Sequence, residues 1–388
     1  MKKVWKFLSY VLVAALTASA TFFWCDSFMS PSGSVAVSKL DQLSALIDER
    51  FIGEANRTAY EDAAADAMVK ALGDEWSYYI PASQYQAHVE TMNNAYVGIG
   101  ITIMVREDQT GFDVTKVNAG GPAEEAGMKP GDVIVAIEGQ STAGMTANDG
   151  RDLVRGEENT NVRLTVERNG EKLELLVQRR QVLTPVAEGR MLDHQIGLIS
   201  IYNFDARCYD ETHAAIEKLL DEGAKALIFD VRNNPGGYKH ELVAILDELL
   251  PEGPLFRAED YLGNQEVDES DASCLEIPMA VLVNGSSYSA AEFFAAALSE
   301  YDAAIVVGQQ TYGKGYFQTT IQLNDGSAVG LSVGKYTTPK GVTLAGVGIT
   351  PDIVVEVDED TDFRIYAGTM PAEEDPQIQA AVNALKAN

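Results

Sequence analysis

The spacing of apolar residues divides the chain into regions with different expected structure. Between residues 35 and about 94, apolar residues recur every three or four positions in LDQLSALIDERF and YEDAAADAMVKAL, which predicts amphipathic helices. Gly73 follows the second segment, where a helix would end. Two such helices bury too little apolar surface to form a core, so we expect them to pack on another domain or on a second subunit.

From residue 96 to about 180 the pattern is typical of short strands and glycine-rich turns, as in YVGIGITIMV, DVIVAIEG and NVRLTVERNG. Gly98 and Gly100 precede the first of these strands, and glycines there would let backbone N–H groups converge on one anion. A tight turn without any ligand also explains these two glycines.

Between residues 184 and about 358, apolar runs typical of buried strands alternate with segments that have the apolar spacing of helices. IGLISIYNF, AKALIFDVR and IPMAVLVNG read as buried strands, whereas YDETHAAIEKLLDEG, KHELVAILDELL and SAAEFFAAALSEY read as helices. This alternation predicts a mostly parallel α/β layer. The tail after Asp358 is acidic and contains prolines, and the pattern assigns it no role.

Lys314 lies in a glycine-rich segment, GQQTYGKGYF, whose G-x-x-x-x-G-K spacing is most of a phosphate-binding loop. Such a loop needs a Ser or Thr directly after the lysine and then a helix. Here Gly315 follows, and YFQTTIQL beyond it is typical of a strand. The pattern therefore argues against a nucleotide site, and a surface lysine in a turn is the simpler alternative.

Composition excludes one class of partner. The 58 acidic and 29 basic residues give a formal charge of -29 over 388 residues, which repels phosphate backbones, so we expect no nucleic acid partner. The four histidines are scattered and the three cysteines form no CxxC pair, so no metal site and no cofactor are expected. An oxidising compartment would allow Cys208 and Cys274 to form a disulfide, but the sequence does not show whether the two residues approach each other.

The N-terminus predicts delivery to a membrane. Three lysines precede the uncharged segment Phe7 to Trp24, as in a signal peptide or an uncleaved anchor, and both alternatives stay open. In either case we expect an extracytoplasmic location, anchored in the membrane or secreted to the cell envelope.

Three serines are candidate nucleophiles because LVNGSSYSAAEFF places a polar turn between a strand and a helix. They are Ser286, Ser287 and Ser289, and helix capping is the simpler explanation of any one of them. Ala290 follows Ser289 at the start of the helix, where its amide would face a developing oxyanion.

A serine nucleophile needs a base, and Lys314 is the candidate. No G-x-S-x-G turn occurs, and neither His213 nor His240 has an accompanying signature. Burial lowers the pKa of a lysine toward neutrality, and glycines on both sides of Lys314 favour close packing. We therefore interpret Lys314 as a general base.

Two resemblances extend this interpretation. GPAEEAGMKPGDVIVAIEG, residues 121–139, resembles a PDZ domain, which implies that Gly98, Ile99, Gly100 and Ile101 bind the C-terminal end of a peptide. The motifs DVRNNPGG, NGSSYSAAEF, TYGKGYFQ and TPKGVTLAGVGITPDIVVE follow one another as in the carboxyl-terminal processing peptidases, the S41 family of serine proteases. This similarity covers residues 40–356.

The resemblance implies roles for five residues. By position, Ser289 is the nucleophile, Lys314 the base and Gln318 the group that orients the base. Gly236 and Ala290 would supply oxyanion-hole amides. Residues 314 and 318 have the same parity, so in a strand they would face the same side.

The sequence departs from the family pattern at two places that carry aromatic residues. Tyr288 and Ala291 replace an Ala and a Ser around Ser289, and Glu75-Trp76 stands where Pro-Tyr is frequent. Tyr288 is expected to narrow the pocket.

The predicted architecture is α/β, with a ClpP/crotonase-like protease core, an inserted PDZ domain and an N-terminal helical segment. The expected divisions are a signal peptide or membrane anchor at 1–30, the helical segment at 31–95, the PDZ domain at 96–182, the Ser-Lys core at 183–358 and the tail at 359–388. We expect a homodimer, because helical N-terminal segments of this family can mediate dimerisation.

The predicted function is a serine endopeptidase that binds protein substrates with accessible C-termini and cleaves them through an acyl-enzyme. One alternative is a non-catalytic PDZ-bearing scaffold that binds peptides. Another is a small-molecule acyl hydrolase on a crotonase-like core, which would not need a PDZ domain.

Overall fold

The computed structural model describes residues 38–387, and the contacts among them group the chain into two units that meet between Ala65 and Asp66. The first unit contains helix α2 (Lys39–Arg50) and the beginning of α3 (Arg57–Lys70). Ser38 and Asp41 form a reciprocal cap at the start of α2, which satisfies backbone N–H groups that a helix leaves free. Helix α2 buries none of its residues within the chain.

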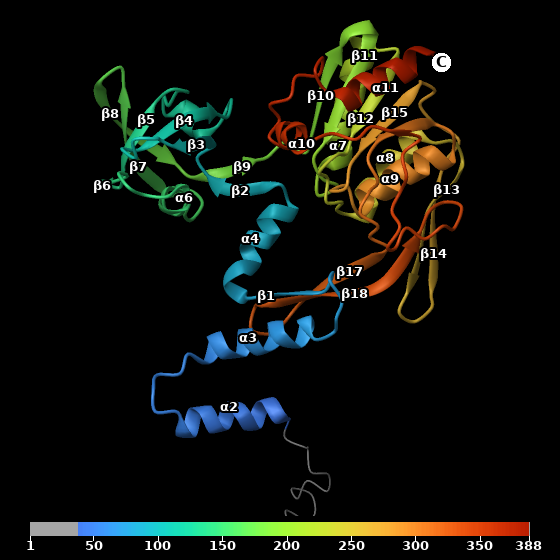
Figure 1. Ribbon diagram of the computed structural model, residues 1–388. Helices are drawn as coiled ribbons and strands as arrows, with labels where there is room; N and C mark the ends of the chain where they lie inside the picture. The colour runs from blue at the N-terminus through green and yellow to red at the C-terminus, as the bar shows by residue number, and fades with distance from the viewer. Residues whose placement is uncertain (1–37, 388) are drawn as a thin grey trace, which may run out of the picture. The chain divides into compact units, whose positions relative to one another are not determined.

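The second unit is built around a six-stranded sheet with the order β10-β11-β12-β15-β16-β19 (Figure 1). The first pair is antiparallel and the other pairings are parallel. The strands are β10 (Ala187–Leu192), β11 (Ile196–Ile201), β12 (Ala226–Asp230), β15 (Met279–Val283), β16 (Ala304–Gly308) and β19 (Ile353–Val354). A short 3₁₀ turn, η1 (Asp193–Gln195), connects β10 to β11. The expected parallel α/β layer is therefore present.

Helices cover both faces of this sheet, which explains why its strands read as continuous apolar runs. Alternate residues of β12 show the division, because Leu227 and Phe229 belong to one core cluster and Ala226 and Ile228 to the other. The first cluster packs against α7 (Cys208–Asp221), α8 (Lys239–Leu249) and α9 (Ala290–Glu300). The second packs against α11 (Pro376–Ala387), which follows α10 (Glu359–Tyr366), so the C-terminal tail completes the core.

A second, antiparallel sheet contains β17, the strand that follows Lys314. Its order is β1-β18-β13-β14, with β17 paired to β18. The strands are β1 (Tyr78–Ile80), β13 (Gly253–Asp260), β14 (Gln265–Ser270), β17 (Tyr316–Gln322) and β18 (Ala328–Thr337). The strand predicted after Lys314 is thus β17, and a phosphate-binding loop, which requires a helix there, is excluded. Helix α4 (Ala82–Met92) follows β1.

Residues 96–182 form a separate small β structure, called the inserted domain below. Its sheet has the order β3-β4-β5-β7-β8, with the short β6 beside β5, and encloses its own apolar core. The strands are β3 (Ile101–Val105), β4 (Phe112–Val117), β5 (Val133–Ile137), β6 (Gln140–Ser141), β7 (Asn161–Arg168) and β8 (Glu171–Gln178), and the helices are α5 (Pro122–Glu125) and α6 (Ala147–Val154). The chain enters and leaves through the antiparallel pair β2 (Ala95–Gly98) and β9 (Arg180–Leu183).

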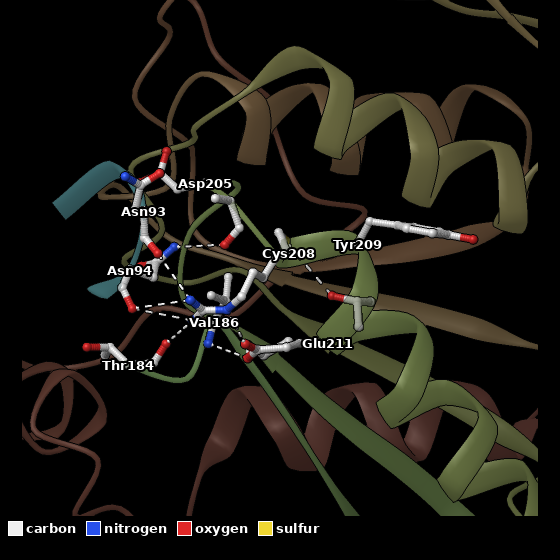
Figure 2. Close-up of polar contacts among 12 residues, drawn as sticks. Asn93, Asn94, Thr184, Val186, Asp205, Cys208, Tyr209 and Glu211 are labelled. Atoms are coloured by element: carbon white, nitrogen blue, oxygen red, sulfur yellow. Dashed lines mark hydrogen bonds and ion pairs between the residues drawn. The ribbon is translucent and has the colours of Figure 1, made fainter. Parts of the chain in front are cut away.

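One guanidinium fixes both connections of the inserted domain. Arg207 donates to the carbonyl oxygens of Asn93 at 3.1 Å and Thr184 at 2.6 Å, and its Nε bonds Glu211 at 3.0 Å. The amide of Thr184 also donates to the carbonyl of Asn94 at 2.7 Å. Figure 2 shows Asn93, Asn94, Thr184 and Glu211 close together near the start of α7. The two ends of the insertion are therefore held beside the core.

Two sequence predictions concern the termini and the cysteines. Among residues 38–387, no helix is both long and apolar enough to cross a bilayer, and the predicted signal or anchor lies outside these residues. Cys208 and Cys274 are both free thiols in this structure, and Cys208 is buried.

Candidate active site

One cleft of about 690 Å³ contains all five residues predicted to act in catalysis. Helix α4, the turn before α8, the start of α9 and strands β17 and β18 contribute its walls. The predicted residues in the lining are Gly236, Ser289, Ala290, Lys314 and Gln318. Sequence positions as far apart as 236 and 318 thus meet at one site.

Ser289 occupies the strained position between the polar turn and α9. Its backbone has φ 59° and ψ -126°, a conformation that non-glycine residues rarely adopt and that is characteristic of functional sites. Its Oγ lies 2.9 Å from the hydroxyl oxygen of Tyr336. The other candidates differ, because Ser287 donates to the carbonyl of Val231 inside the core and Ser286 is exposed.

Lys314 lies in the loop between β16 and β17, between two buried glycines. A side chain at Gly315 would meet Ala345 at 2.5 Å, and Gly313 has φ 96°, so both positions require glycine. Burial lowers the pKa of Lys314 from 10.5 to about 8, against the opposing fields of Asp74 and Glu292. A general base that works near neutral pH needs a lowered pKa of this kind.

Glu292 connects the serine turn to the lysine loop. Its Oε2 accepts from the amides of Ser289 at 3.1 Å and Lys314 at 2.9 Å, and its Oε1 accepts from the hydroxyl of Thr311 and the amide of Gly313. Burial raises the pKa of this fully buried carboxyl, while the four donated hydrogen bonds oppose the shift. One side chain therefore sets the distance between the two backbone segments.

The nucleophile and the base make separate contacts in this structure. Ser289 contacts Tyr336, whereas Lys314 Nζ lies 4.5 Å from the centre of the Trp76 ring. Gln318 donates to Ser332 Oγ at 3.0 Å and to the carbonyl of its neighbour Tyr316.

Lys314 and Gln318 do not lie together on one regular strand, so the prediction that their parity places them on the same side is wrong in its physical basis. Strand β17 begins at Tyr316, after Lys314, and a β-bulge between Phe317 and Gln318 breaks the alternation of side chains. Both side chains nevertheless line the cleft.

The two predicted oxyanion donors differ in availability. The amide of Ala290 donates no hydrogen bond among the described residues. The amide of Gly236 donates to Asn234 Oδ1 at 2.8 Å in this structure. A Cβ at Gly236 would lie 2.6 Å from the Cβ of Ser289, which explains the glycine.

Asp205 is a further titratable group in the cleft lining. It is 7 % exposed and its Oδ1 has no hydrogen-bond partner. Burial, with a contribution from Glu241, raises the pKa of Asp205 to about 7. Figure 2 shows it close to Asn93 and Cys208, where the inserted domain connects to the core.

The four predicted peptide-binding residues lie at the beginning of an open strand edge in the inserted domain. Among residues 38–387, strand β3 pairs only with β4, and Ile101 is its first residue. Gly100 has φ 75°, and Ile99 is buried in the domain core. Gly98 ends β2. An unpaired edge of this kind accepts an added peptide strand.

Sequence reasoning missed three residues at the site. Glu292 had a signal, because it lies three residues after Ser289, the spacing of a capping box. Tyr336 and Trp76 had none that local patterns reveal, since Tyr336 reaches the site from β18 and Trp76 from the turn before β1.

Comparison with known proteins decides the family. The sequence pattern described as peptidase family S41 matches residues 195–355, and that of the PDZ domain matches residues 114–168. A "Carboxy-terminal processing protease CtpA" of Bacillus subtilis (strain 168) is 31% identical over 367 residues, covering 92% of this chain and 78% of the relative. The chain belongs to peptidase family S41.

Other members agree with this assignment. A "Probable CtpA-like serine protease" of Staphylococcus aureus (strain MRSA252) is 30% identical over 378 residues, covering 95% of this chain and 76% of the relative. A solved S41 protease of Bacteroides fragilis NCTC 9343 aligns with a TM-score of 0.54 at 15% identity, covering 89% of this chain and 97% of that one, and shares the fold. This S41 chain is thus a serine-type peptidase with a PDZ domain, as the resemblance predicted.

Proposed function

We propose that this S41 peptidase is an endopeptidase of the C-terminal processing type with a Ser289-Lys314 catalytic pair. The observation that carries the proposal is the pairing of a strained, cleft-lining serine with a partly buried lysine of lowered pKa, both tied to Glu292. A lysine whose pKa is near 8 has an appreciable free-amine fraction at neutral pH and can accept a proton.

In the first half-reaction, Ser289 Oγ attacks the peptide carbonyl carbon while Lys314 Nζ takes the Oγ proton. The amide of Ala290 donates to the oxyanion that forms, and the amide of Gly236 contributes once it leaves Asn234. The C–N bond then breaks, the ammonium of Lys314 protonates the leaving amine, and an acyl-enzyme remains on Ser289.

In the second half-reaction, Lys314 takes a proton from water as the water oxygen attacks the acyl carbon. The ester C–O bond breaks, and the proton returns from Lys314 to Ser289 Oγ. Ser289 and Lys314 share no hydrogen bond among the described residues, so Nζ must approach Oγ in either step, and Gln318 would orient it from β17.

The PDZ domain supplies substrate recognition in this proposal. A protein C-terminus would add to the free edge of β3, with its carboxylate at the amides of Gly98 to Ile101. Occupancy of this site would position the chain for cleavage and organise the catalytic cleft.

Cleavage assays on matched variants test the catalytic pair. The wild type, Ser289→Ala and Lys314→Ala would be incubated with an unfolded protein that ends in apolar residues, and fragments would be read by mass spectrometry. Ser286→Ala and Lys340→Ala, which change exposed residues nearby, are the controls and should cleave normally. Cleavage that survives in Ser289→Ala would disprove the assignment of the nucleophile.

A non-catalytic peptide-binding scaffold is the second candidate. It is favoured by the separate contacts of Ser289 with Tyr336 and of Lys314 with Trp76. Binding of the same C-terminal peptide without cleavage by the wild type, across the pH range 7 to 10 that spans the lysine titration, would support it.

A further inference from the structure

Three aromatic rings form a cluster at the ammonium group of Lys314. Trp76 lies 4.5 Å from Nζ, and its ring packs on Tyr312 at 5.4 Å and on Tyr288 at 5.9 Å between centroids. Tyr288 and Tyr312 are themselves 5.8 Å apart, which closes the group. We call Trp76, Tyr288 and Tyr312 the aromatic cluster.

The aromatic cluster is assembled from three separate segments of the core. Trp76 precedes β1, Tyr288 directly precedes the nucleophile, and Tyr312 lies two residues before the lysine. Trp76 and Tyr288 are also two of the positions at which the sequence departs from the family pattern. The two departures therefore meet in space beside the proposed base.

The carboxylates around Lys314 accept hydrogen bonds from other groups, and the direct contact of its ammonium is the Trp76 ring. Asp74 accepts from the amide of Trp76 and the hydroxyl of Ser77, and Glu292 is occupied by its four donors. Glu75 lies 3.5 Å from the hydroxyl of Tyr312. No ion pair to Lys314 occurs among residues 38–387, although Asp74 and Glu292 both favour its charged form through their fields.

A ring face in this position discriminates between the two forms of the amine. The negative face of an aromatic ring attracts an ammonium, tryptophan most strongly, but attracts a neutral amine much less. The contact therefore opposes the effect of burial and retains the proton on Lys314.

We propose that the aromatic cluster is a positioning set for the catalytic base, which holds the ammonium form of Lys314 at the Trp76 ring and so sets the pH above which the peptidase has a free base. The inference rests on the proposed function, in which Lys314 is that base.

Titration of Lys314 itself tests the cluster without relying on activity. Full-length protein carrying Ser289→Ala would be labelled with trace acetic anhydride across a pH series, and peptide mass spectrometry would give the labelled fraction of Lys314, which follows its free amine. Trp76→Phe keeps a ring, whereas Trp76→Leu keeps apolar bulk without one. We expect the pKa to fall in the order Trp, Phe, Leu, with a total decrease of roughly 0.5 to 1.5 pH units.

Tyr288→Phe is the matched control, because it retains the ring and removes only a hydroxyl, and its Lys314 pKa should equal that of the parent. An unchanged or increased pKa in Trp76→Leu would overturn the inference. The inference would also be overturned if the pKa of Lys314 were the same in Trp76→Phe, in Trp76→Leu and in the parent protein.

The pH dependence of kcat/KM, measured with Ser289 present, separates this inference from the proposed function. If both hold, the acidic limb in Trp76→Leu moves to lower pH by the shift seen in labelling. A labelling shift in a protein that cleaves nothing would refute the proposed function and leave the cluster's effect on Lys314 established. Cleavage with an unmoved acidic limb and an unmoved labelling pKa would refute the cluster alone.

Discussion

Replacement of Lys314 by methionine should make the protein more stable at neutral pH. The folded state lowers the pKa of this lysine from 10.5 to about 8, and each pKa unit corresponds to about 1.4 kcal/mol, so burial of the charge costs about 3 kcal/mol below pH 8. Methionine fills a similar volume without a charge, but it loses the contact with Trp76, worth about 1 kcal/mol. The expected net gain at pH 7 is therefore about 2 kcal/mol.

The gain should depend on pH in a defined direction. Between pH 8 and 10.5 the unfolded wild type binds more protons at this position than the folded wild type, so wild-type stability rises with pH through this window. The Lys314→Met protein lacks this rise. The difference between the two proteins should therefore decrease from pH 8 and be smallest above pH 10.5.

Urea unfolding at several pH values measures this difference. Trp76 contacts residue 314, and the chain has only two other tryptophans, so their replacement by phenylalanine makes fluorescence report the core transition. Lys340→Met, at an exposed lysine, is the matched control and should leave the pH profile of stability unchanged. Equal stability of wild type and Lys314→Met at pH 7, or a difference that stays constant to pH 10.5, would refute the reasoning.

Three further predictions concern other parts of the molecule. Glu292→Gln replaces two acceptor oxygens by one and turns an NH₂ group toward backbone donors. We expect kcat/KM to fall at least roughly 100-fold while circular dichroism shows the fold retained, and an unchanged kcat/KM would contradict this role. Gly100→Val should reduce binding of a C-terminal peptide roughly tenfold or more in a fluorescence polarisation assay, whereas Gly139→Ala, at another left-handed turn of the PDZ domain, should not; equal affinities would contradict the assigned site. If the exposed leucines of α2 mediate the expected homodimer, Leu43→Glu should convert a dimer to a monomer in analytical ultracentrifugation, and an unchanged mass would exclude α2 as the interface.

The sequence predicts the layers of the core because the strands of a buried parallel sheet are apolar along their whole length. IGLISIYNF, AKALIFDVR and IPMAVLVNG were identified in this way, and they are β11, β12 and β15. The tail shows where pattern reading stops. Helix α11 is amphipathic, with Ile378 and Leu385 buried, but its acidic, proline-containing surroundings concealed a helix that packs on one face of the central sheet.

The site could be predicted only where chemistry is encoded locally. Ser289 and Lys314 each stand in a short motif, and Glu292 has a capping-box spacing from the serine. Tyr336 lies 47 residues from Ser289, so its hydrogen bond depends on how β18 is placed by its sheet. The parity of Gln318 could not be read correctly, because a β-bulge is a property of strand pairing and leaves no periodic signal.

The two ends of the inserted domain lie side by side, paired as β2 and β9, so the domain is attached to the core at one place. Residue Ala95 pairs with Leu183, and Arg207 binds backbone carbonyls on both sides of the insertion. The core therefore requires only two chain ends a strand spacing apart, whatever lies between them. A different closed domain with adjacent termini could replace the PDZ domain without disturbing the catalytic sheet, so recognition and hydrolysis can diverge independently in such a chain.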